Sequence, residues 1–319
     1  MSITVVVCTF NRCGMLVDTL KSIAESSIPS SVEWEILVVD NNSTDETKAA
    51  VDRISREYPG RFRYLLEKSQ GVSHARNAGI HASRGDILAF TDDDVTVEAS
   101  WLWNLTSPLH AGDWAGAAGR IAPVWSCARP PWLPVGERSV MAAFVAFDLG
   151  PIAGPLLEPP FGANMAFRKS VFAKYGGFRT DLGRTAERLL GSEDSEFGRR
   201  LLVNGERLRY EPSAVVHHPV PESRLSKKYH LAWWYGKARS DIRASGIPEE
   251  TRWLFGGIPL FLLRRFARWA LQWMTSVEPS RRFYAKLVVW RTAGEIVECY
   301  RYSRSANKRL GDSMGVRSH

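Results

Sequence analysis

The sequence predicts an α/β fold with a mostly parallel sheet flanked by helices and a helical C-terminal extension. In the first third of the chain, short continuous apolar segments alternate with amphipathic segments of helical length. Such apolar runs are typical of parallel strands that helices cover on both faces. Polar residues follow several of these runs, as at the ligand-binding edge of a parallel sheet. The expected strands are residues 3–8, 35–39, 62–66 and 87–91, and the expected helices are residues 15–26, 44–58 and 72–83.

Length and composition indicate an ordinary globular protein. With 319 residues, 45% of them hydrophobic, the chain can form one large domain or two. We expect a first domain over residues 1–223, made of halves 1–120 and 121–223, and a separate region over residues 224–319. Eight prolines between residues 123 and 160 predict a loop-rich segment, which is either a lid over a site or a surface excursion.

The cysteines and the N-terminus favour a cytoplasmic protein. Four cysteines show no CxxC spacing, which argues against a zinc site or a disulfide framework. The N-terminus enters an apolar strand without a basic leader, so we expect no secretory signal. The most apolar run, residues 253–263, is interrupted by glycine and proline and is too short to span a bilayer.

Charge is unevenly distributed along the chain. Residues 224–319 contain 19 Lys and Arg against 7 Asp and Glu, whereas the formal charge of the whole chain is +8. A basic tail of this kind indicates an anionic surface as partner. Residues 258–274 have the pattern of an interfacial helix, with arginines on one face and leucine and tryptophan on the other. We expect peripheral contact with an anionic membrane through residues 225–305, at the inner face of the plasma membrane, and no nucleic-acid binding. The alternative is a helix that packs on the first domain.

Three consecutive acids, Asp92, Asp93 and Asp94, stand where the apolar strand 87–91 ends. Adjacent carboxylates repel one another, so they favour a divalent cation that also bridges to substrate phosphates. The alternative is a solvated turn that caps the next helix. Polar residues also follow the first two predicted strands, and no glycine-rich phosphate loop is present. These residues are Thr9, Asn11 and Arg12 after the first strand and Asp40 after the second.

A second acidic pair, Glu193 and Asp194, opens an amphipathic helix. Acids in a first helical turn interact favourably with the helix dipole, so capping is one explanation. The same dipole keeps an aspartate ionised, as a general base requires. Farther along, His217 and His218 follow a predicted strand at residues 214–216, and we slightly favour His217 as a functional residue.

In this order, the motifs resemble the family 2 glycosyltransferases of the GT-A fold. The resemblance covers roughly residues 2–220 and depends on the ordered set of motifs rather than on any single one. The matching segments are VVVCTFNR at 5–12, VVDNNSTD at 38–45, ARNAG at 75–79, FTDDD at 90–94, GANMAFR at 162–168, GGF at 176–178 and ED at 193–194.

The resemblance implies an inverting transferase that uses a nucleotide sugar, with UDP as the expected nucleotide. Residues 1–120 would bind the donor and residues 121–223 the acceptor. Asp94, with Asp92 and one histidine, would hold Mn²⁺ or Mg²⁺, and Asp194 would act as the base, a role that Glu193 could share. Asn164 would contact the acceptor, a glycan, glycolipid or small molecule. The implied donor-binding residues are Thr9, Asn11, Arg12, Asp40, Arg76, Asp92 and Asp93.

Two other functions remain open from the sequence. Related α/β sheets also carry out nucleotidyl transfer, because a fold alone does not fix a reaction. The second open function is a non-catalytic module that binds membrane or nucleic acid through its basic tail. Processive synthases similar to this family carry a Gln-x-x-Arg-Trp motif; here Arg265 stands in place of the glutamine, before Arg268 and Trp269. We therefore expect transfer of a single sugar.

Overall fold

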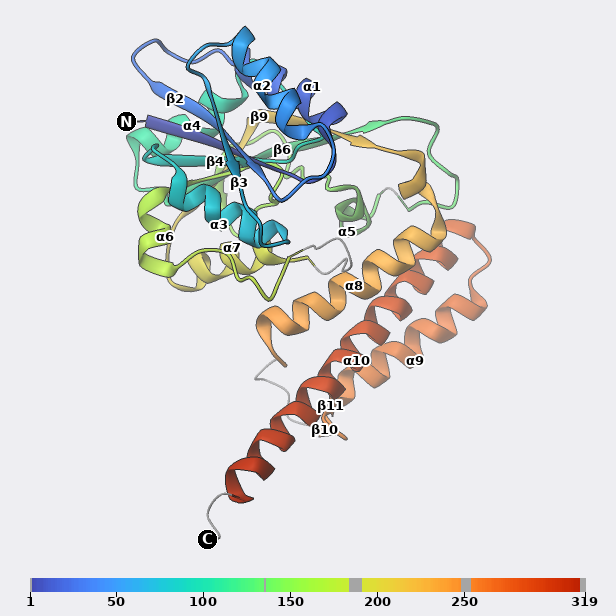
Figure 1. The fold of residues 1–319 in the computed structure, drawn as a ribbon. Helices are drawn as coiled ribbons and strands as arrows, with labels where there is room; N and C mark the ends of the chain where they lie inside the picture. The colour runs from blue at the N-terminus through green and yellow to red at the C-terminus, as the bar shows by residue number, and fades with distance from the viewer. Residues whose placement is uncertain (1, 135, 184–190, 248–253, 316–319) are drawn as a thin grey trace. The chain divides into compact units, whose positions relative to one another are not determined.

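The computed structural model describes residues 2–134, 136–183, 191–247 and 254–315 (Figure 1). The chain divides into two compact units. The first unit contains Met1–Ser126, Phe144–Arg188 and Glu193–Pro221, and the second contains Cys127–Ala143, Leu189–Ser192 and Glu222–His319.

The first unit is built on one sheet with the strand order β3-β2-β1-β4-β8-β6-β9-β5, in which β7 also pairs with β9. Strands β1, β2, β3 and β4 run parallel to one another, and β6 runs parallel to β9. Strand β8 is antiparallel to both of its neighbours, β4 and β6. The first half contains β1 (Ser2–Thr9), α1 (Cys13–Ala24), β2 (Glu33–Asp40), α2 (Thr47–Glu57), β3 (Phe62–Leu66), α3 (Val72–Ala82) and β4 (Ile87–Thr91).

The second half of this unit completes the sheet. Its elements are β5 (Thr96–Val97), α4 (Trp101–Ala111), β6 (Gly116–Trp125), β7 (Gly154–Leu156), β8 (Met165–Arg168), α6 (Lys169–Tyr175), α7 (Glu193–Val203) and β9 (Leu208–Val220). Along the chain between β6 and β7, α5 (Arg138–Met141) and η1 (Ala142–Phe144) are single turns, and α5 belongs to the second unit. The sequence analysis did not anticipate α4, β5, β7 or β8, and it expected only three residues of the thirteen-residue β9.

Helices cover both faces of the sheet, as the continuous apolar strands predict (Figure 1). One core places α1, α2 and α4 against one face through residues such as Leu20, Ile54 and Trp101. The other core places α3, α6 and α7 against the opposite face through Ile80, Phe172 and Phe197. The predicted fold class, a mostly parallel sheet flanked by helices, is therefore confirmed.

Strand β9 contains an irregularity in its pairing with β6. Gly119 of β6 pairs with Glu211, whereas the next residue, Arg120, pairs with Val215, so three residues of β9 have no partner on β6. Extra residues of this kind form a bulge, which changes the faces to which the following side chains point. The bulge therefore determines the orientation of the two histidines that follow it.

The second unit contains three long helices. They are α8 (Lys227–Ser245), α9 (Leu260–Thr275) and α10 (Pro279–Gly315), preceded by the short η2 (Glu222–Leu225) and a hairpin of β10 (Leu254–Phe255) and β11 (Ile258–Pro259). The ring of Trp273 on α9 packs against that of Trp290 on α10. Helix α8 approaches α10 closely at Gly294, where an added Cβ would lie 2.6 Å from the Tyr235 carbonyl oxygen. Within the described residues, no helix has both the length and the apolar composition needed to cross a bilayer.

Helix α9 coincides with the segment in which we expected an interfacial helix, but its arginines are not all on one face as expected. We expected Arg265 on a solvated basic face, and it instead faces α10, where it hydrogen bonds to Thr292 and forms an ion pair with Glu295. The exposed face instead includes Leu271 and Met274, which are 60% and 68% exposed, together with Arg264 and Arg268. Part of the apolar surface of α9 therefore points away from its partner helix.

Candidate functional site

The site lies at the carboxyl ends of β1, β2 and β4. Parallel strands place these ends at one edge of the sheet, where α/β folds bind their ligands. Thr9, the last residue of β1, donates a hydrogen bond of 2.7 Å to Asp93, which follows β4. The structure therefore brings together two residues that the sequence analysis placed at the donor site.

The loops after β1 and β2 are joined by direct hydrogen bonds. The Asn11 amide oxygen accepts a 2.7 Å bond from the Thr44 backbone N–H, and the Asn11 N–H donates to Ser43 Oγ. Asn11 and Asn42 both adopt positive φ values, 53° and 68°, which asparagine tolerates better than most residues. The bonds give this side of the site a defined shape.

Asp40 is buried and already has two hydrogen-bond partners. One carboxylate oxygen accepts a 2.7 Å bond from the Tyr64 hydroxyl, and the other accepts from the Ser43 N–H at 2.8 Å. Burial is the main cause that raises the pKa of Tyr64, and the hydrogen bond to Asp40 raises it further. Asp40 therefore fixes the loop that follows β2 and the aromatic ring on β3.

Arg12 neutralises two of the three adjacent acids. Its Nη1 lies 3.0 Å from Asp93 Oδ1 and 3.0 Å from Asp94 Oδ2. Burial raises the pKa of Asp93 to about 6, although Arg12 and the Thr9 hydroxyl act in the opposite direction. The positive partner that the acid triplet requires is, in part, supplied by the chain itself.

Asp92, Asp94 and His218 form the one group among the described residues whose side chains could hold a metal ion together. His218 Nε2 lies 3.6 Å from Asp94 Oδ1 and 4.0 Å from Asp92 Oδ2. Asp94 Oδ1 is buried and accepts no hydrogen bond, a costly state for a carboxylate oxygen. Two carboxylates and one imidazole suit Mn²⁺ or Mg²⁺, so these residues fit a divalent cation.

The protonation of His218 also suits a metal ligand. Its Nδ1 lies 2.9 Å from the Pro219 carbonyl oxygen, which can only accept a hydrogen bond. The proton of a neutral imidazole is therefore on Nδ1, and the Nε2 lone pair points toward the acids. A hydrogen bond from the second ring nitrogen is the usual way in which proteins orient a metal-binding histidine.

The structure selects His218 rather than His217, which the sequence analysis slightly favoured. His217 points to the other face of β9, where its Nε2 lies 3.2 Å from Glu98 on the surface. Successive side chains of a strand point to opposite faces, so only one of two adjacent histidines can face the acids. The identity of that histidine depends on the bulge in β9, which the sequence does not reveal.

Arg76 links the acids after β4 to those at the start of α7. It is buried, with Nη1 2.5 Å from Glu193 Oε1 and Nη2 3.7 Å from Asp92 Oδ1. Burial alone would lower the pKa of Arg76, but Glu193, Asp92 and Asp194 raise it above its ordinary value. Gly162 leaves room for the guanidinium, since an added Cβ would lie 2.2 Å from Arg76 Nη2. We expected Arg76 to contact the donor. In the structure it forms an internal ion pair with Glu193.

Among the described residues, backbone donors rather than a cation are in direct contact with Asp194. Its Oδ2 accepts a 2.8 Å bond from the Gly162 N–H, and its Oδ1 accepts a 2.6 Å bond from the Ser195 N–H. Ser192, two residues earlier, has a φ of 88°, which is rare outside glycine and often found at functional sites. Asp194 is only partly buried, whereas Glu193 is buried against Arg76. Of the two acids, Asp194 is the one with access to a ligand.

Asn164 does not occupy an acceptor site, contrary to our expectation. Its side chain is fully buried, accepts a 2.8 Å bond from Trp101 Nε1 and donates to the carbonyl oxygens of Arg120 and Ala214. Both carbonyls lie at the β6–β9 bulge. Asn164 therefore stabilises the backbone that places His218, and it has no surface for a substrate.

Comparison with known proteins identifies the family. The model of glycosyl transferase family 2 matches residues 4–176. A succinoglycan biosynthesis protein, ExoM of Rhizobium meliloti, is 30% identical over 232 residues, which cover 71% of this chain and 68% of that protein. A glucosyl-dolichyl phosphate glucuronosyltransferase of Haloferax volcanii is 25% identical over 251 residues, 75% of this chain and 76% of that protein.

Solved structures agree on the fold. The mannosyltransferase PcManGT of Pyrobaculum calidifontis, determined with GDP-Man and Mn²⁺, has a TM-score of 0.56 at 20% identity, covering 99% of this chain and 81% of that chain. The S. aureus protein TarS 1–349, determined with UDP, has a TM-score of 0.51 at 15% identity, covering 97% of this chain and 92% of that chain. These likenesses confirm the expected GT-A fold. Together with the family match, they show that the chain belongs to glycosyl transferase family 2 and is a glycosyltransferase.

Proposed function

We propose that this glycosyltransferase moves one sugar from a nucleotide sugar to an acceptor hydroxyl, with a divalent cation and with inversion at the anomeric carbon. The observation that carries the proposal is the buried Asp94 Oδ1, which accepts no hydrogen bond and lies 3.6 Å from His218 Nε2. A donor diphosphate needs a cation of this kind, because it leaves with growing negative charge. When bound, the cation stabilises that charge.

The donor side consists of the strand ends in residues 1–120. Thr9, Asn11 and Arg12 line it after β1, and Asp40 fixes the loop after β2. Asp94, Asp92 and His218 are the residues that would hold Mn²⁺ or Mg²⁺. UDP and GDP-Man are bound by the structural neighbours, and Mn²⁺ accompanies GDP-Man in one of them. UDP-sugars with Mn²⁺ are therefore the first donors to test.

The acceptor side includes Asp194 in the second half of the unit. A hydroxyl is a weak nucleophile, and a carboxylate on the far side of the anomeric carbon removes its proton as the bond forms. Asp194 suits this role because two backbone N–H groups hold its carboxylate and none of the described residues forms a direct ion pair with it. Glu193 is already paired with Arg76, so we assign it to positioning rather than to proton transfer.

The variant Asp194→Asn tests the assignment of the base. We expect transfer to fall by about 10²–10⁴-fold while UDP affinity, measured by calorimetry in Mn²⁺, is retained. Asp52→Asn is the matched control, because Asp52 is an exposed acid on α2 that pairs only with Lys48 among the described contacts. Loss of UDP binding in Asp194→Asn would contradict the role. The anomeric configuration of the product, read by NMR, tests inversion separately.

For the second unit, we propose peripheral contact with an anionic membrane, through which a lipid-linked or glycan acceptor would be reached. The exposed apolar residues of α9, Leu271 and Met274, lie near Arg264 and Arg268 in the sequence, a composition suited to anionic headgroups. Flotation with phosphatidylglycerol vesicles tests this contact. We expect binding that weakens as salt is raised and that is absent from phosphatidylcholine vesicles. Equal binding to both vesicles would contradict it.

A further inference from the structure

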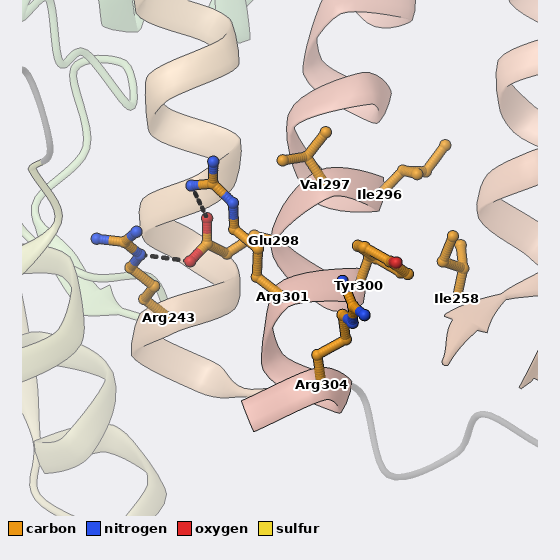
Figure 2. A pocket seen from close by; sticks show the side chains of 8 residues that line it. All are labelled: Arg243, Ile258, Ile296, Val297, Glu298, Tyr300, Arg301 and Arg304. Carbon is orange, nitrogen blue, oxygen red and sulfur yellow. Dashed lines mark hydrogen bonds and ion pairs between the residues drawn. The ribbon is translucent and has the colours of Figure 1, made fainter. Parts of the chain in front are cut away.

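A pocket of about 810 Å³ opens in the second unit between α8, α10 and the β10–β11 hairpin (Figure 2). Arg243 of α8 and Arg301 and Arg304 of α10 line it, with one carboxylate, Glu298. Ile258 of β11 and Tyr300 of α10 add an apolar wall. The proposed catalytic residues are all in the first unit, so this pocket is a separate feature of the chain.

The charges around the pocket do not balance. Glu298 accepts hydrogen bonds from Arg243 at 2.5 Å and from Arg239 at 2.9 Å, and Arg301 lies 4.0 Å away. Burial would raise the pKa of Glu298, but the two hydrogen bonds hold it below its ordinary value. Among the described residues that line the pocket, Glu298 is the one acid against three arginines. The lining therefore has a net positive charge that an anion would offset.

Arginine is well suited to one class of anion in particular. Its planar guanidinium donates in a fork that matches the oxygens of a phosphate group. Arg304 is exposed and lies over the Tyr300 ring, with its Cζ 5.5 Å from the ring centroid. In Figure 2, the Arg301 side chain extends toward Glu298, whereas Arg304 lies beside the Tyr300 ring. A phosphate in the pocket could receive donors from two helices.

The apolar wall indicates that the phosphate belongs to an amphiphile. Ile258 continues directly into the hairpin, where Leu254 and Phe255 are 55% and 71% exposed. The turn between the strands packs tightly on α10, since an added Cβ at Gly257 would lie 2.2 Å from Ser303 Oγ. The exposed apolar residues of β10 are thus fixed beside the basic pocket. Free phosphate would gain nothing from these apolar groups, whereas the acyl chains of a lipid would bury them.

We propose that this pocket binds the phosphate headgroup of a membrane lipid, with Arg243, Arg301 and Arg304 as the phosphate ligands and Leu254 and Phe255 of β10 in the apolar layer. The inference rests on the proposed membrane contact and gives it a defined site. In addition to the general electrostatic attraction between a basic surface and an anionic bilayer, the chain would then have one specific lipid-binding site.

Calorimetric titration of the full chain with dihexanoyl phosphatidic acid, a monomeric short-chain lipid, tests the site. We expect this lipid to bind about tenfold more tightly than inorganic phosphate, because its chains cover at least two methylene equivalents of apolar surface. The double variant Arg301→Gln/Arg304→Gln should weaken lipid binding about tenfold or more. Arg304→Gln alone leaves the contacts of Glu298 with Arg239, Arg243 and Arg301 in place and should give part of the loss.

The matched control is Arg281→Gln/Arg282→Gln, which removes the same charge from exposed positions on the same helix. Its lipid affinity should stay within about twofold of the unmodified chain. Equal losses in both double variants would refute a defined site and leave only general electrostatic attraction. Inorganic phosphate that binds as tightly as the lipid would refute the lipid headgroup as ligand. In either case, retained flotation with phosphatidylglycerol vesicles would show that the membrane contact itself stands.

Discussion

The buried pair of Arg76 and Glu193 allows a quantitative test of how the two acidic motifs are held together. Their side chains are 7% and 8% exposed, with 2.5 Å between Nη1 and Oε1. The variant Arg76→Met removes the guanidinium from the buried Glu193 carboxylate, and breaking a buried pair in this way costs about 3–5 kcal/mol. For a unit of this size, that loss corresponds to a fall in Tm of roughly 10 °C.

The other two variants complete a double-mutant cycle. Glu193→Leu should also destabilise, although by less, because Arg76 keeps Asp92 at 3.7 Å. Arg76→Met/Glu193→Leu removes both charges and replaces them with apolar groups, so its stability should recover most of the loss. Thermal melting followed by circular dichroism gives the three differences. A coupling free energy below about 0.5 kcal/mol would refute the pair as the link between the motifs.

Two further predictions concern the histidines and the buried amide. His218→Ala should weaken Mn²⁺ binding about tenfold or more, whereas His217→Ala should leave it unchanged; equal effects in calorimetry would contradict the assignment. Asn164→Leu should lower the free energy of unfolding by roughly 3 kcal/mol, because it leaves the Trp101 indole N–H and two carbonyl groups unpaired. A normal Tm with a raised KM for the acceptor would restore Asn164 to substrate binding.

The sequence predicted the first half of the catalytic unit well because each strand there is a continuous apolar run followed by a helix. Successive residues such as Val5 and Val6 are buried on opposite faces of the sheet, and the local sequence pattern alone indicates that state. Strands β5, β7 and β8 were not recognised, because each has only two to four residues and pairs with strands far away in the sequence. Such short strands are stabilised by their neighbours rather than by their own composition.

The candidate site likewise contains residues that could be predicted from the sequence and contacts that could not. The acid triplet and the residues after β1 could be predicted, since the edge at which parallel strands end is fixed by topology. The partner of Arg76 could not be predicted, because Glu193 is 117 residues away and the contact depends on how α7 docks. The inward face of α9 was also missed: Arg265 is accommodated there by Glu295 of α10, and helical periodicity on one segment does not reveal an acid on another.

The bulge in β9 has a consequence for how this chain could change by insertion or deletion. Asn164 bonds the two carbonyl groups that border it, and the strand resumes regular pairing at Val215, three residues before His218. Adding one residue within the bulge, with the strand positions beyond it kept, would move each later side chain one position along β9 and bring His217 to the place of His218. Removing one residue would instead bring Pro219 there, which has no metal-binding side chain. The second histidine therefore compensates for an insertion of one residue but not for a deletion, and in the present chain the Pro219 carbonyl orients His218.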